Sequence, residues 1–417
     1  MNRSRRTTAA LLAALAAACA RGPADTARSL PLPPIALRPL QGELTALGKT
    51  MPQVPAEAAN ELRDLADIAL HIVEADSRTS THAERALLEH PFAWSVLEPA
   101  LDHADVAVRK RAAWLAGRTG QSILVVPLLL RLKYELDSDA ILWAADALQR
   151  LGNDAGLSWL EAAMGVAATA QQAGTMAIEI CRERGVPLGE SPTYDELRAH
   201  LRTLLAAWLQ TGLGSRPGTA PPDPVQLDAR LAIHLSTTQG TQLRPVDDAR
   251  FVLTRAGMLG VPLMTRALGA EENYLRTMAL QVLADLRSPA HSASGAVLAL
   301  LGDPFTASYA VRTLGEIGAA EAIPHLRARL ASPDTEIRAA VPPALGLLGD
   351  RASAEALRKS LRDSNEVLDV RVNAAFGLLC LGPDHDAEAF LAEREQKADY
   401  HAPTLVRLRE RLALLRH

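Results

Sequence analysis

The stretch "DTEIRAAVPPALGLLGDRASAEALRKSL", from Asp334 to Leu361, is predicted to form two short amphipathic helices joined by a turn. In its first half, small side chains and leucines recur at steps of three and four, which places them on one face of a helix. Gly349 follows that half and supplies the left-handed backbone conformation that commonly ends a helix. The pattern therefore predicts one helical hairpin.

Two prolines, Pro342 and Pro343, lie near the middle of the first helix of this hairpin. A proline inside a helix removes a backbone hydrogen bond and costs about 3 kcal/mol in isolation. Because the equivalent helices elsewhere in the chain have the same length, we expect the prolines to kink this helix rather than end it. A hinge at this position is the alternative.

Comparable stretches recur along the chain, each ended by a closing residue that is usually glycine. The intervals between closing residues are 32 and 33 residues in the first half of the chain, and 31, 31 and 33 in the second half. A fixed period of this size is typical of stacked helical hairpins, so the predicted fold is an all-α solenoid. The closing residues are Gly120, Gly152, Gly185, Arg287, Gly318, Gly349 and Gly382.

A small side chain also recurs, eight residues before each closing residue. An alanine at the same place in each helix, beside leucines, allows neighbouring helices to approach closely. We therefore expect these side chains to be buried between repeats. The predicted packing positions are Ala112, Ala144, Ala177, Ala279, Ala310, Val341 and Ala374.

This pattern resembles the HEAT-like repeats of the phycobilisome-lyase type, over most of residues 80–395. The resemblance implies an inter-repeat ladder, in which an acid in a turn pairs with an arginine that opens the next helix. Ile141, Gly174 and Ala307 stand where other repeats have the arginine, so the ladder is expected to be incomplete. The ladder residues predicted in this way are Asp105, Arg109, Arg276, Asp334, Arg338 and Arg371.

The repeat is interrupted in the middle of the chain. A helix opened by a capping box from Thr193 to Glu196 precedes a loop rich in proline and glycine. This insertion either divides the solenoid into two arrays or projects from one face, where it is a candidate for a binding role or a simple surface loop. The last helix of the chain is expected to cap the stack or, alternatively, to meet anionic lipid. The predicted segments are an N-terminal array at 57–185, the insertion at 186–246 and a C-terminal array with its capping helix at 247–417.

The amino terminus has a basic start followed by twelve apolar residues, Ala9 to Ala20. This is the pattern of a signal peptide, and it is shorter than the about 20 apolar residues that span a bilayer. The stretch "LAAAC" resembles a bacterial lipoprotein signal, which implies lipidation of Cys19. Ordinary cleavage nearby, which would leave a soluble periplasmic protein, is the alternative. We predict a signal peptide at 1–18 and a Pro-rich tether at 19–56.

Composition argues against nucleic-acid binding. The formal net charge is −4, and removing Arg3, Arg5 and Arg6 with the signal peptide takes away three positive charges and leaves −7. Proteins that bind phosphate backbones usually carry a basic excess or a basic stripe, and neither is present in the sequence.

No motif in the sequence indicates catalysis. The three cysteines have no metal-type spacing, and no G-x-S-x-G, phosphate-binding glycine loop or dinucleotide fingerprint occurs. The HEAT-like enzyme deoxyhypusine hydroxylase holds its metal pair with His-Glu dipeptides, and this sequence contains none. We therefore predict no catalytic residue, no cofactor and no metal.

Two tryptophans and two arginines near the start of the array form a candidate protein-binding patch: Trp114, Arg118, Trp143 and Arg150. Tryptophan and arginine are enriched at interface hot spots. The alternative is that the tryptophans are half-buried between repeats and the arginines lie in water.

The functional hypothesis is a non-catalytic protein-binding scaffold with an unidentified protein partner. It would be lipid-anchored in a bacterial cell envelope, facing the periplasm or the cell surface. One alternative is an enzyme or enzyme accessory, a lyase-like domain that binds a small molecule. The other is an intracellular scaffold.

Overall fold

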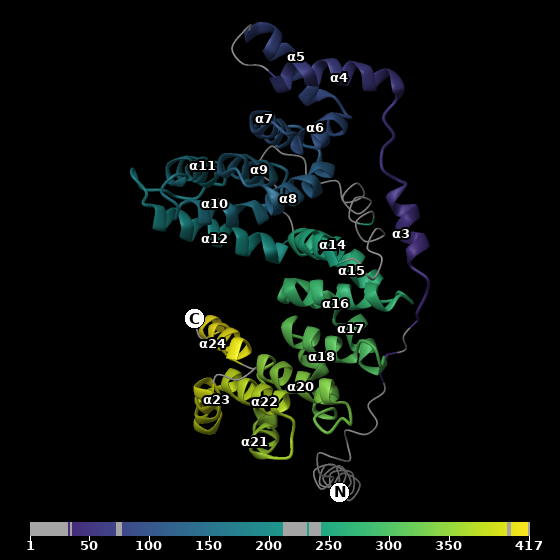
Figure 1. Cartoon of the computed structure of the whole chain (residues 1–417), viewed down its shortest axis with the longest axis vertical. Helices are drawn as coiled ribbons and strands as arrows, with labels where there is room; N and C mark the ends of the chain where they lie inside the picture. Colours follow the sequence, from purple (N-terminus) through teal and green to yellow (C-terminus); the bar gives the residue numbers. More distant parts are fainter. Residues whose placement is uncertain are drawn as a thin grey trace, which may run out of the picture. The chain divides into compact units, whose positions relative to one another are not determined.

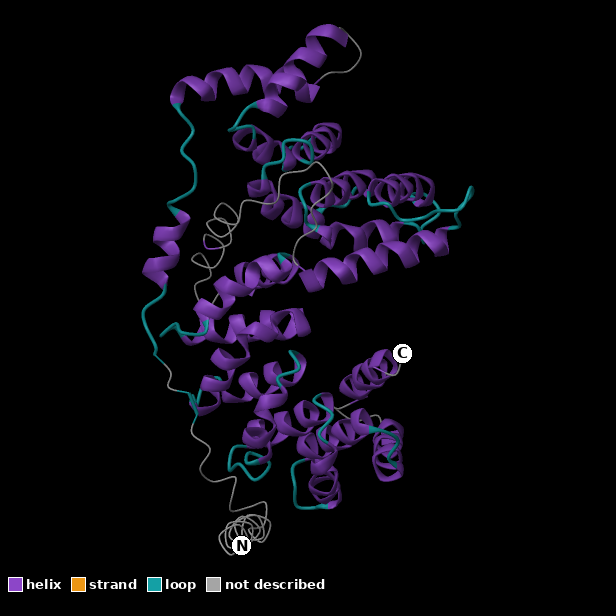
Figure 2. Cartoon of the chain, turned by 180° about the vertical axis from the view of Figure 1, so that it is seen from behind, coloured by secondary structure: helices purple, strands orange, loops and turns teal. Residues whose placement is uncertain are grey.

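The computed structural model describes residues 32–33, 36–71, 77–211, 232, 243–397 and 402–415. Among these residues the regular structure is helical, with no strand and one isolated parallel bridge between Arg38 and Ala270 (Figure 2). The predicted all-α fold is confirmed. Within the same residues, no helix combines the length and the apolar character needed to cross a membrane. The predicted signal peptide and Cys19 lie outside the described part of the chain.

The chain divides into two compact units, and the boundary falls within helix α16 (Asn273–Leu286). The N-terminal unit, 38–282, is a stack of helical hairpins (Figure 1). Its other α-helices are α3 (Gln41–Gly48), α4 (Ala56–His71), α5 (Ser77–Glu89), α6 (Trp94–Leu101), α7 (Val106–Ala116), α8 (Val125–Tyr134), α9 (Ser138–Arg150), α10 (Leu157–Ala163), α11 (Ala170–Glu183), α12 (Tyr194–Thr211), α14 (Leu243–Arg255) and α15 (Val261–Ala267).

The C-terminal unit contains the residues from Leu283 onward and continues the same hairpin pattern. Its α-helices are α17 (Ser294–Ala299), α18 (Ala307–Glu316), α19 (Ile323–Arg327), α20 (Thr335–Leu347), α21 (Ala354–Arg362), α22 (Leu368–Leu381), α23 (His385–Lys397) and α24 (Ala402–Leu415). In both units short 3₁₀ helices precede or follow the shorter α-helices: η1 (Ser122–Leu124), η2 (Asp154–Gly156), η3 (Gly257–Gly260), η4 (Ser288–Ala293), η5 (Leu300–Gly302), η6 (Ala320–Ala322) and η7 (Arg351–Ser353).

Each closing residue adopts the backbone conformation that its position requires. The six closing glycines have φ between 68° and 148°. Arg287, the exception in the sequence pattern, has φ 61° and is the one non-glycine residue with positive φ among the described residues. We call the helix that a closing residue ends a first helix. The residue after each first helix therefore has a positive φ even where it is arginine.

The seven predicted packing positions are all buried, with 0% of each residue exposed. The tightest contacts between first helices, however, lie at glycines that the sequence analysis did not single out. A Cβ on Gly117 would lie 2.6 Å from Cα of Ala147, and one on Gly315 would lie 2.6 Å from Cα of Ala344. In both pairs the glycine lies three positions before the closing residue of its own helix. The alanine that it contacts lies five positions before the closing residue of the next first helix. Neighbouring first helices therefore touch backbone to backbone.

Helix α20 continues through Pro342 and Pro343, as expected of prolines that do not end a helix. The adjacent helix α22 presents Gly377 to this region, and a Cβ on Gly377 would collide with the Pro342 carbonyl oxygen. A Cβ on Gly346 of α20 would in turn lie 2.5 Å from the Gly377 carbonyl oxygen. The absence of side chains at these two glycines lets α22 approach the proline-containing helix on the packing face.

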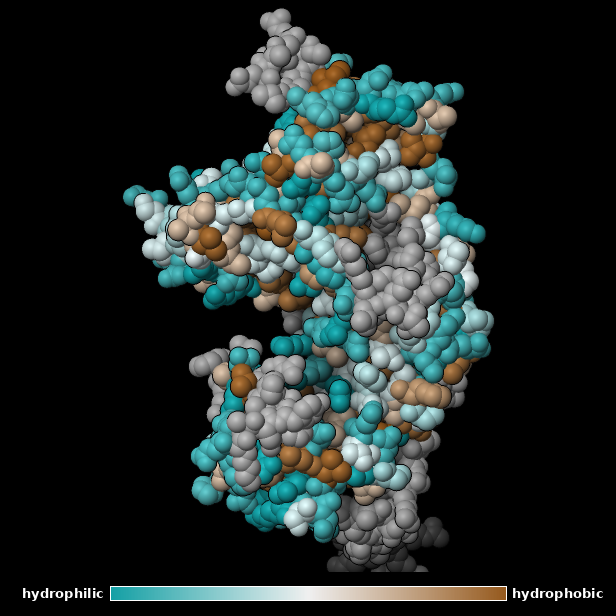
Figure 3. All heavy atoms as spheres, in the orientation of Figure 1, coloured by the Kyte–Doolittle hydropathy of each residue, from teal (hydrophilic) through white to brown (hydrophobic). Residues whose placement is uncertain are grey.

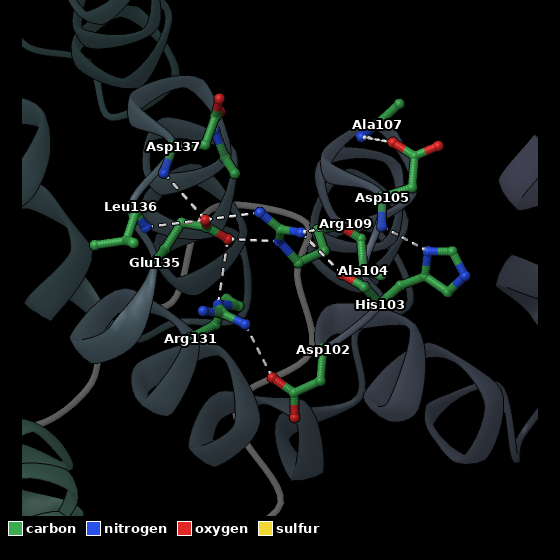
Figure 4. Close-up of polar contacts among 11 residues, drawn as sticks. Asp102, His103, Ala104, Asp105, Ala107, Arg109, Arg131, Glu135, Leu136 and Asp137 are labelled. Atoms are coloured by element: carbon green, nitrogen blue, oxygen red, sulfur yellow. Dashed lines mark hydrogen bonds and ion pairs between the residues drawn. The ribbon is translucent and has the colours of Figure 1, made fainter.

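An arginine and an acid join consecutive repeats at the turn between α8 and α9 (Figure 4). Arg109, on α7, donates from Nε and Nη2 to the two carboxylate oxygens of Glu135, at 2.8 and 2.9 Å. The same guanidinium donates from Nη1 to the carbonyls of His103 and Ala104, at 2.8 and 2.9 Å. Arg109 therefore ties the turn before its own helix to the turn of the next repeat.

The Glu135 carboxylate is enclosed by donors, and only 1% of its side chain is exposed. The backbone N–H groups of Leu136 and Asp137 donate to it, both at 3.0 Å, and Arg131 forms an ion pair with it at 3.3 Å. Burial alone raises the pKa of Glu135, but the hydrogen bonds from Arg109 and the two N–H groups, with the charge of Arg131, lower it overall to about 2.

The acids expected in the ladder, Asp105 and Asp334, have a different role. Asp105 accepts a hydrogen bond from the N–H of Ala107 at 2.8 Å, and Asp334 accepts one from the N–H of Glu336 at 2.8 Å. Each therefore caps the start of its own helix, where free N–H groups need an acceptor. The acid that pairs with the arginine comes from the following inter-repeat turn.

The C-terminal unit repeats this arrangement. Arg338 donates to the carboxylate of Glu366, at 3.2 and 3.0 Å, and to the carbonyls of Ser332 and Pro333, at 2.8 and 3.0 Å. The other two predicted ladder arginines also bind carbonyls of the preceding turn region. Arg276 donates to Ala270 at 2.6 Å, and Arg371 donates to Leu361 at 2.9 Å.

The insertion begins with the predicted capping box. The N–H of Glu196 donates to Oγ1 of Thr193 at 3.3 Å, and the N–H of Thr193 donates to Oε2 of Glu196 at 2.8 Å. The helix it opens, α12, packs against α10 and α11 as the second helix of a hairpin. The predicted loop that follows lies outside the described residues.

Contacts within the N-terminal unit run across the insertion. The Nδ2 of Asn153 donates to the Arg255 carbonyl at 2.9 Å, and the Nζ of Lys133 pairs with Asp248 at 2.7 Å. Trp208 is buried and donates from Nε1 to the Gly152 carbonyl at 3.1 Å. Hairpins on the two sides of the insertion are therefore in direct contact.

Part of the segment expected to be a tether is docked on the N-terminal unit. The Glu272 carboxylate accepts hydrogen bonds from the N–H groups of Leu40 and Gln41, at 3.3 and 3.2 Å, where α3 begins. Leu40 and Leu44 are 0% and 1% exposed. The prediction was therefore wrong for this helix. Leu40 and Leu44 become buried because the distant region before α16 supplies the surface on which α3 packs.

The last helix, α24, caps the C-terminal stack. Leu405 and Leu412 are buried in the cluster that includes Phe376 of α22. Arg409 donates from Nε to Glu395 at 2.8 Å. The arginine side of this helix thus bonds to carboxylates of the unit itself, which favours the capping role over a lipid-binding one.

We expect Arg287→Gly to stabilise the chain by about 1 kcal/mol, because a side chain at this φ costs energy that glycine does not. Arg287 is exposed, so little packing is lost. Urea unfolding followed by circular dichroism measures the effect. The reciprocal change Gly349→Arg, at φ 71° with nothing within 4 Å of a built Cβ, should destabilise by a similar amount. A lower urea midpoint for Arg287→Gly would contradict the assignment.

The buried Glu135 should make folding pH-dependent. Its pKa in the folded chain, about 2, lies below the ordinary value of 4.5. The stabilisation is therefore fully present above pH 4.5 and is lost as pH falls toward 2, by about 3 kcal/mol in total. We expect the difference in unfolding free energy between wild type and Glu135→Gln to be largest at pH 7 and to shrink below pH 4.5. Glu190→Gln, at an exposed carboxylate, serves as the control, and a difference independent of pH would argue against this role.

Candidate protein-binding cleft

A cleft of about 540 Å³ is lined by α9, by α11 with the turn before it, and by Arg118 in the turn after α7. Helix α7 packs against α9, and α10 packs against both α9 and α11, so side chains of three successive repeats come together there. The residues of the cleft that matter most for its chemistry are Arg118, Trp143, Asp146, Arg150, Met176 and Glu179.

The structure brings the four residues of the predicted patch to this one place. Arg118, Trp143 and Arg150 line the cleft. Trp114 stacks against Arg118, whose guanidinium carbon lies 4.0 Å from the centroid of the Trp114 ring, and Arg111 approaches the same ring at 4.4 Å. Cation–π contact of this kind holds a guanidinium in place while leaving its edge available.

Asp146 anchors one side of the cleft. Only 4% of its side chain is exposed, and it accepts hydrogen bonds from Nε2 of Gln149 at 2.8 Å and from Nε of Arg150 at 2.7 Å. Arg150 also lies 3.9 Å from a carboxylate oxygen of Glu179. The positive charge of Arg150 is therefore balanced within the protein.

Arg118 differs from Arg150 because no ion pair to it is present among the described residues. Its Nη1 donates to the Trp114 carbonyl at 3.0 Å. Burial lowers the pKa of Arg118, and the positive charge of Arg150 lowers it further, against smaller opposite effects of Asp146 and Glu179. A half-buried cation is thus held at the wall of an open cleft with donors to spare.

The rim of the cleft is exposed. Gln171, Thr175 and Glu179 on α11 all face solvent, as does Ala168 in the turn before it, whereas Met176 is buried. Sites for small molecules usually bury most of the ligand surface. The open rim of this cleft, with Trp143 and Met176 beside the half-buried Arg118, would enclose a small molecule poorly.

The contribution of α11 to the cleft was not recognised as part of the patch, although the repeat contains a signal for it. Trp114, Asp146 and Glu179 each lie six residues before a closing glycine, and Arg118 and Arg150 lie two before. These two positions face away from the packing side, so in stacked repeats they form one continuous surface. The period therefore locates this surface, while the ion pairs on it depend on the side chains present.

Two observations concern the metal-ligating and thiol side chains of the described residues. No group of three or more His, Cys, Asp or Glu side chains among them is placed to hold a metal ion. Cys181 is buried, and burial raises the pKa of its thiol despite the charge of Arg184. Such a thiol is a poor nucleophile.

A second cleft, of about 680 Å³, lies between α4 and α6. Figure 3 shows hydrophobic side chains gathered on the surface of these N-terminal helices. Leu70, Val96 and Pro99 line the cleft together with charged residues of both signs, among them Arg63 and Asp67. It has no counterpart of the half-buried Arg118, since Arg63 is exposed.

Comparison with known proteins identifies the repeat. Residues 296–379 match the family described as HEAT repeats. They contain the hairpins closed by Gly318 and Gly349, so this part of the solenoid is built of HEAT repeats. No curated protein sequence gives a significant match to the chain.

Several solved structures are similar in fold. Human deoxyhypusine hydroxylase in complex with glycerol is 18% identical, with a TM-score of 0.26, and the match covers 72% of this chain and 100% of that one. The karyopherin Kap121p bound to the extreme C-terminus of the protein phosphatase Cdc14p is 13% identical, with a TM-score of 0.29, covering 90% of this chain and 56% of that one. Kap121p bound to Ste12p is 14% identical, with a TM-score of 0.29, covering 84% and 52%. The chain thus spans about half the length of the karyopherin.

Proposed function

We propose that this chain is a non-catalytic protein-binding scaffold tethered in a bacterial cell envelope. The observation that carries the binding role is the cleft formed by α7, α9 and α11, in which Trp143 and the half-buried Arg118 meet. Aromatic and arginine side chains in a partly desolvated hollow are the usual centres of binding energy at protein interfaces. The open rim leaves room for a polypeptide segment to enter and leave.

The solenoid suits this role for a physical reason. Each hairpin is stabilised by its neighbours, so the face opposite the packing side is free to vary without loss of the fold. We assign the repeats to the phycobilisome-lyase type of HEAT-like repeat, on the pattern of alanine, leucine and closing glycine quoted above. We prefer a scaffold to a lyase-like enzyme because the buried acid of the cleft, Asp146, is already engaged by Gln149 and Arg150.

The envelope location rests on the sequence of the amino terminus. The basic start, the apolar stretch of twelve residues and the small residues before Cys19 support a lipoprotein signal. Because Arg38 is already paired with Ala270 on the folded unit, at most about 70 Å of extended chain separates it from Cys19. A lipid on Cys19 would therefore limit how far Arg38 can lie from the membrane surface.

The partner-binding role predicts which substitutions release a partner. Proteins retained from solubilised membranes by the wild-type chain should fall at least about tenfold in abundance with Trp114→Ala/Trp143→Ala, because the aromatic wall of the cleft is lost. Quantitative mass spectrometry of the captured proteins provides the measurement. Trp159→Ala, at a tryptophan that lies 6.2 Å from Phe251 and does not line the cleft, is the matched control. An unchanged set of partners in the double variant would exclude the cleft.

The lipid anchor predicts a defined amino terminus. Mass spectrometry of the mature protein should show Cys19 as the first residue, carrying a diacylglyceryl group, and the protein should sediment with membranes. Cys19→Ala should abolish that modification and shift the protein to the soluble fraction or leave it unprocessed. Wild-type protein with an intact Met1 would rule out the envelope location.

A further inference from the structure

The two units treat the same face of the repeat differently. In the C-terminal unit the positions two and six residues before the closing glycines include Glu316 and Phe376. Helix α24 covers them. Arg411 of α24 forms an ion pair with Glu316, and its guanidinium carbon lies 5.6 Å from the centroid of the Phe376 ring. Leu405 and Leu412 of the same helix are buried beside α22.

This contact has three components that can be read directly. The amphipathic helix α24 supplies apolar side chains. Its Arg411 pairs with Glu316, which lies two residues before Gly318. The same arginine lies over the ring of Phe376, which lies six residues before Gly382. The chain thus shows what kind of structure its own repeat face accepts. The helix bound there, α24, contributes the positive charge of Arg411, which is opposite to that of Glu316.

In the N-terminal unit two of the equivalent positions, Arg118 and Arg150, carry the opposite charge to Glu316, and no helix like α24 lines the cleft beside them among the described residues. Arg118 stands two residues before Gly120, where the C-terminal unit has Glu316 before its closing glycine. Trp114 supplies the aromatic ring at the position six residues before, and Trp143 adds a second ring. The lining of the cleft comes only from α7, α9, α11 and the adjoining turns.

Arg118 requires a partner of a specific kind. Its guanidinium is half-buried, stacked on Trp114 and bonded to one carbonyl, and the neighbouring acid Asp146 is already engaged by Arg150 and Gln149. A carboxylate entering the cleft would accept the remaining N–H donors in the bidentate geometry that guanidinium groups favour. A basic or uncharged segment would leave the positive charge of Arg118 unbalanced.

We infer that this cleft binds an amphipathic helix of another protein, through a carboxylate that pairs with Arg118 and apolar side chains that pack on Trp143 and Met176. The contact resembles that of α24 in one respect: a charged side chain of the bound helix pairs with the opposite charge two residues before a closing glycine. This inference rests on the proposed scaffold function and adds the chemical nature of the partner.

A displayed library of amphipathic helical peptides of about four turns, with randomised exposed positions, tests the inference when it is selected on the full-length protein. We expect the selected peptides to share an Asp or Glu at one position. They should bind Arg118→Glu at least about tenfold more weakly than wild type, and replacing that acid by Arg in the peptide should restore binding to the variant.

The matched control is Lys359→Glu, which makes the same change of charge at an exposed residue of α21. Circular dichroism melting checks that Arg118→Glu is folded, and Arg118→Gln provides a second, milder variant. Selected peptides without a shared acid, whose binding depends on Trp143 but not on Arg118, would overturn the inference and leave the scaffold function standing. A selection that yields no peptide dependent on Trp143 would overturn both.

Discussion

The backbones of neighbouring first helices approach so closely that a methyl group would not fit between them at Gly117, Gly315 and Gly346. At these three junctions the contact requires glycine on one helix and alanine or glycine on the next, and it sets the spacing between those helices. The alanines eight residues before the closing residues lie on the same buried face. Because each hairpin is held by its neighbours rather than by a central core, the stability of the chain is the sum of many such contacts.

Two further devices maintain the stack once the helices are in contact. The closing residue directs the chain from one helix into the next, and its φ is positive even where the sequence has Arg287 instead of glycine. The pairs Arg109–Glu135 and Arg338–Glu366 then connect the turns of consecutive repeats. These pairs are buried enough to need several hydrogen bonds each, and the carbonyls of the turns provide them.

Packing on one side of each first helix leaves the other side free for binding. In the C-terminal unit the chain covers this side with its own last helix, through Arg411 on Glu316. In the N-terminal unit the same side forms the cleft around Arg118 and Trp143. The proposed function follows from that contrast, since one periodic surface is closed by the protein itself and the other is open with an unbalanced charge.

The sequence by itself determined the all-α fold, the period of the repeat, the buried alanines and the grouping of Trp114, Arg118, Trp143 and Arg150 at one place. These features depend on spacing along single helices, which short-range geometry dictates. The sequence did not reveal that Glu135 and Glu366, rather than Asp105 and Asp334, complete the ladder, because acids that begin helices and acids that bridge turns look alike until the turns are placed in space. Nor did it reveal that α3 packs beside Glu272, more than two hundred residues away, or that α12 joins hairpins across the insertion through Trp208. Only the tertiary structure decided these contacts, because each one depends on a surface that distant parts of the chain build together.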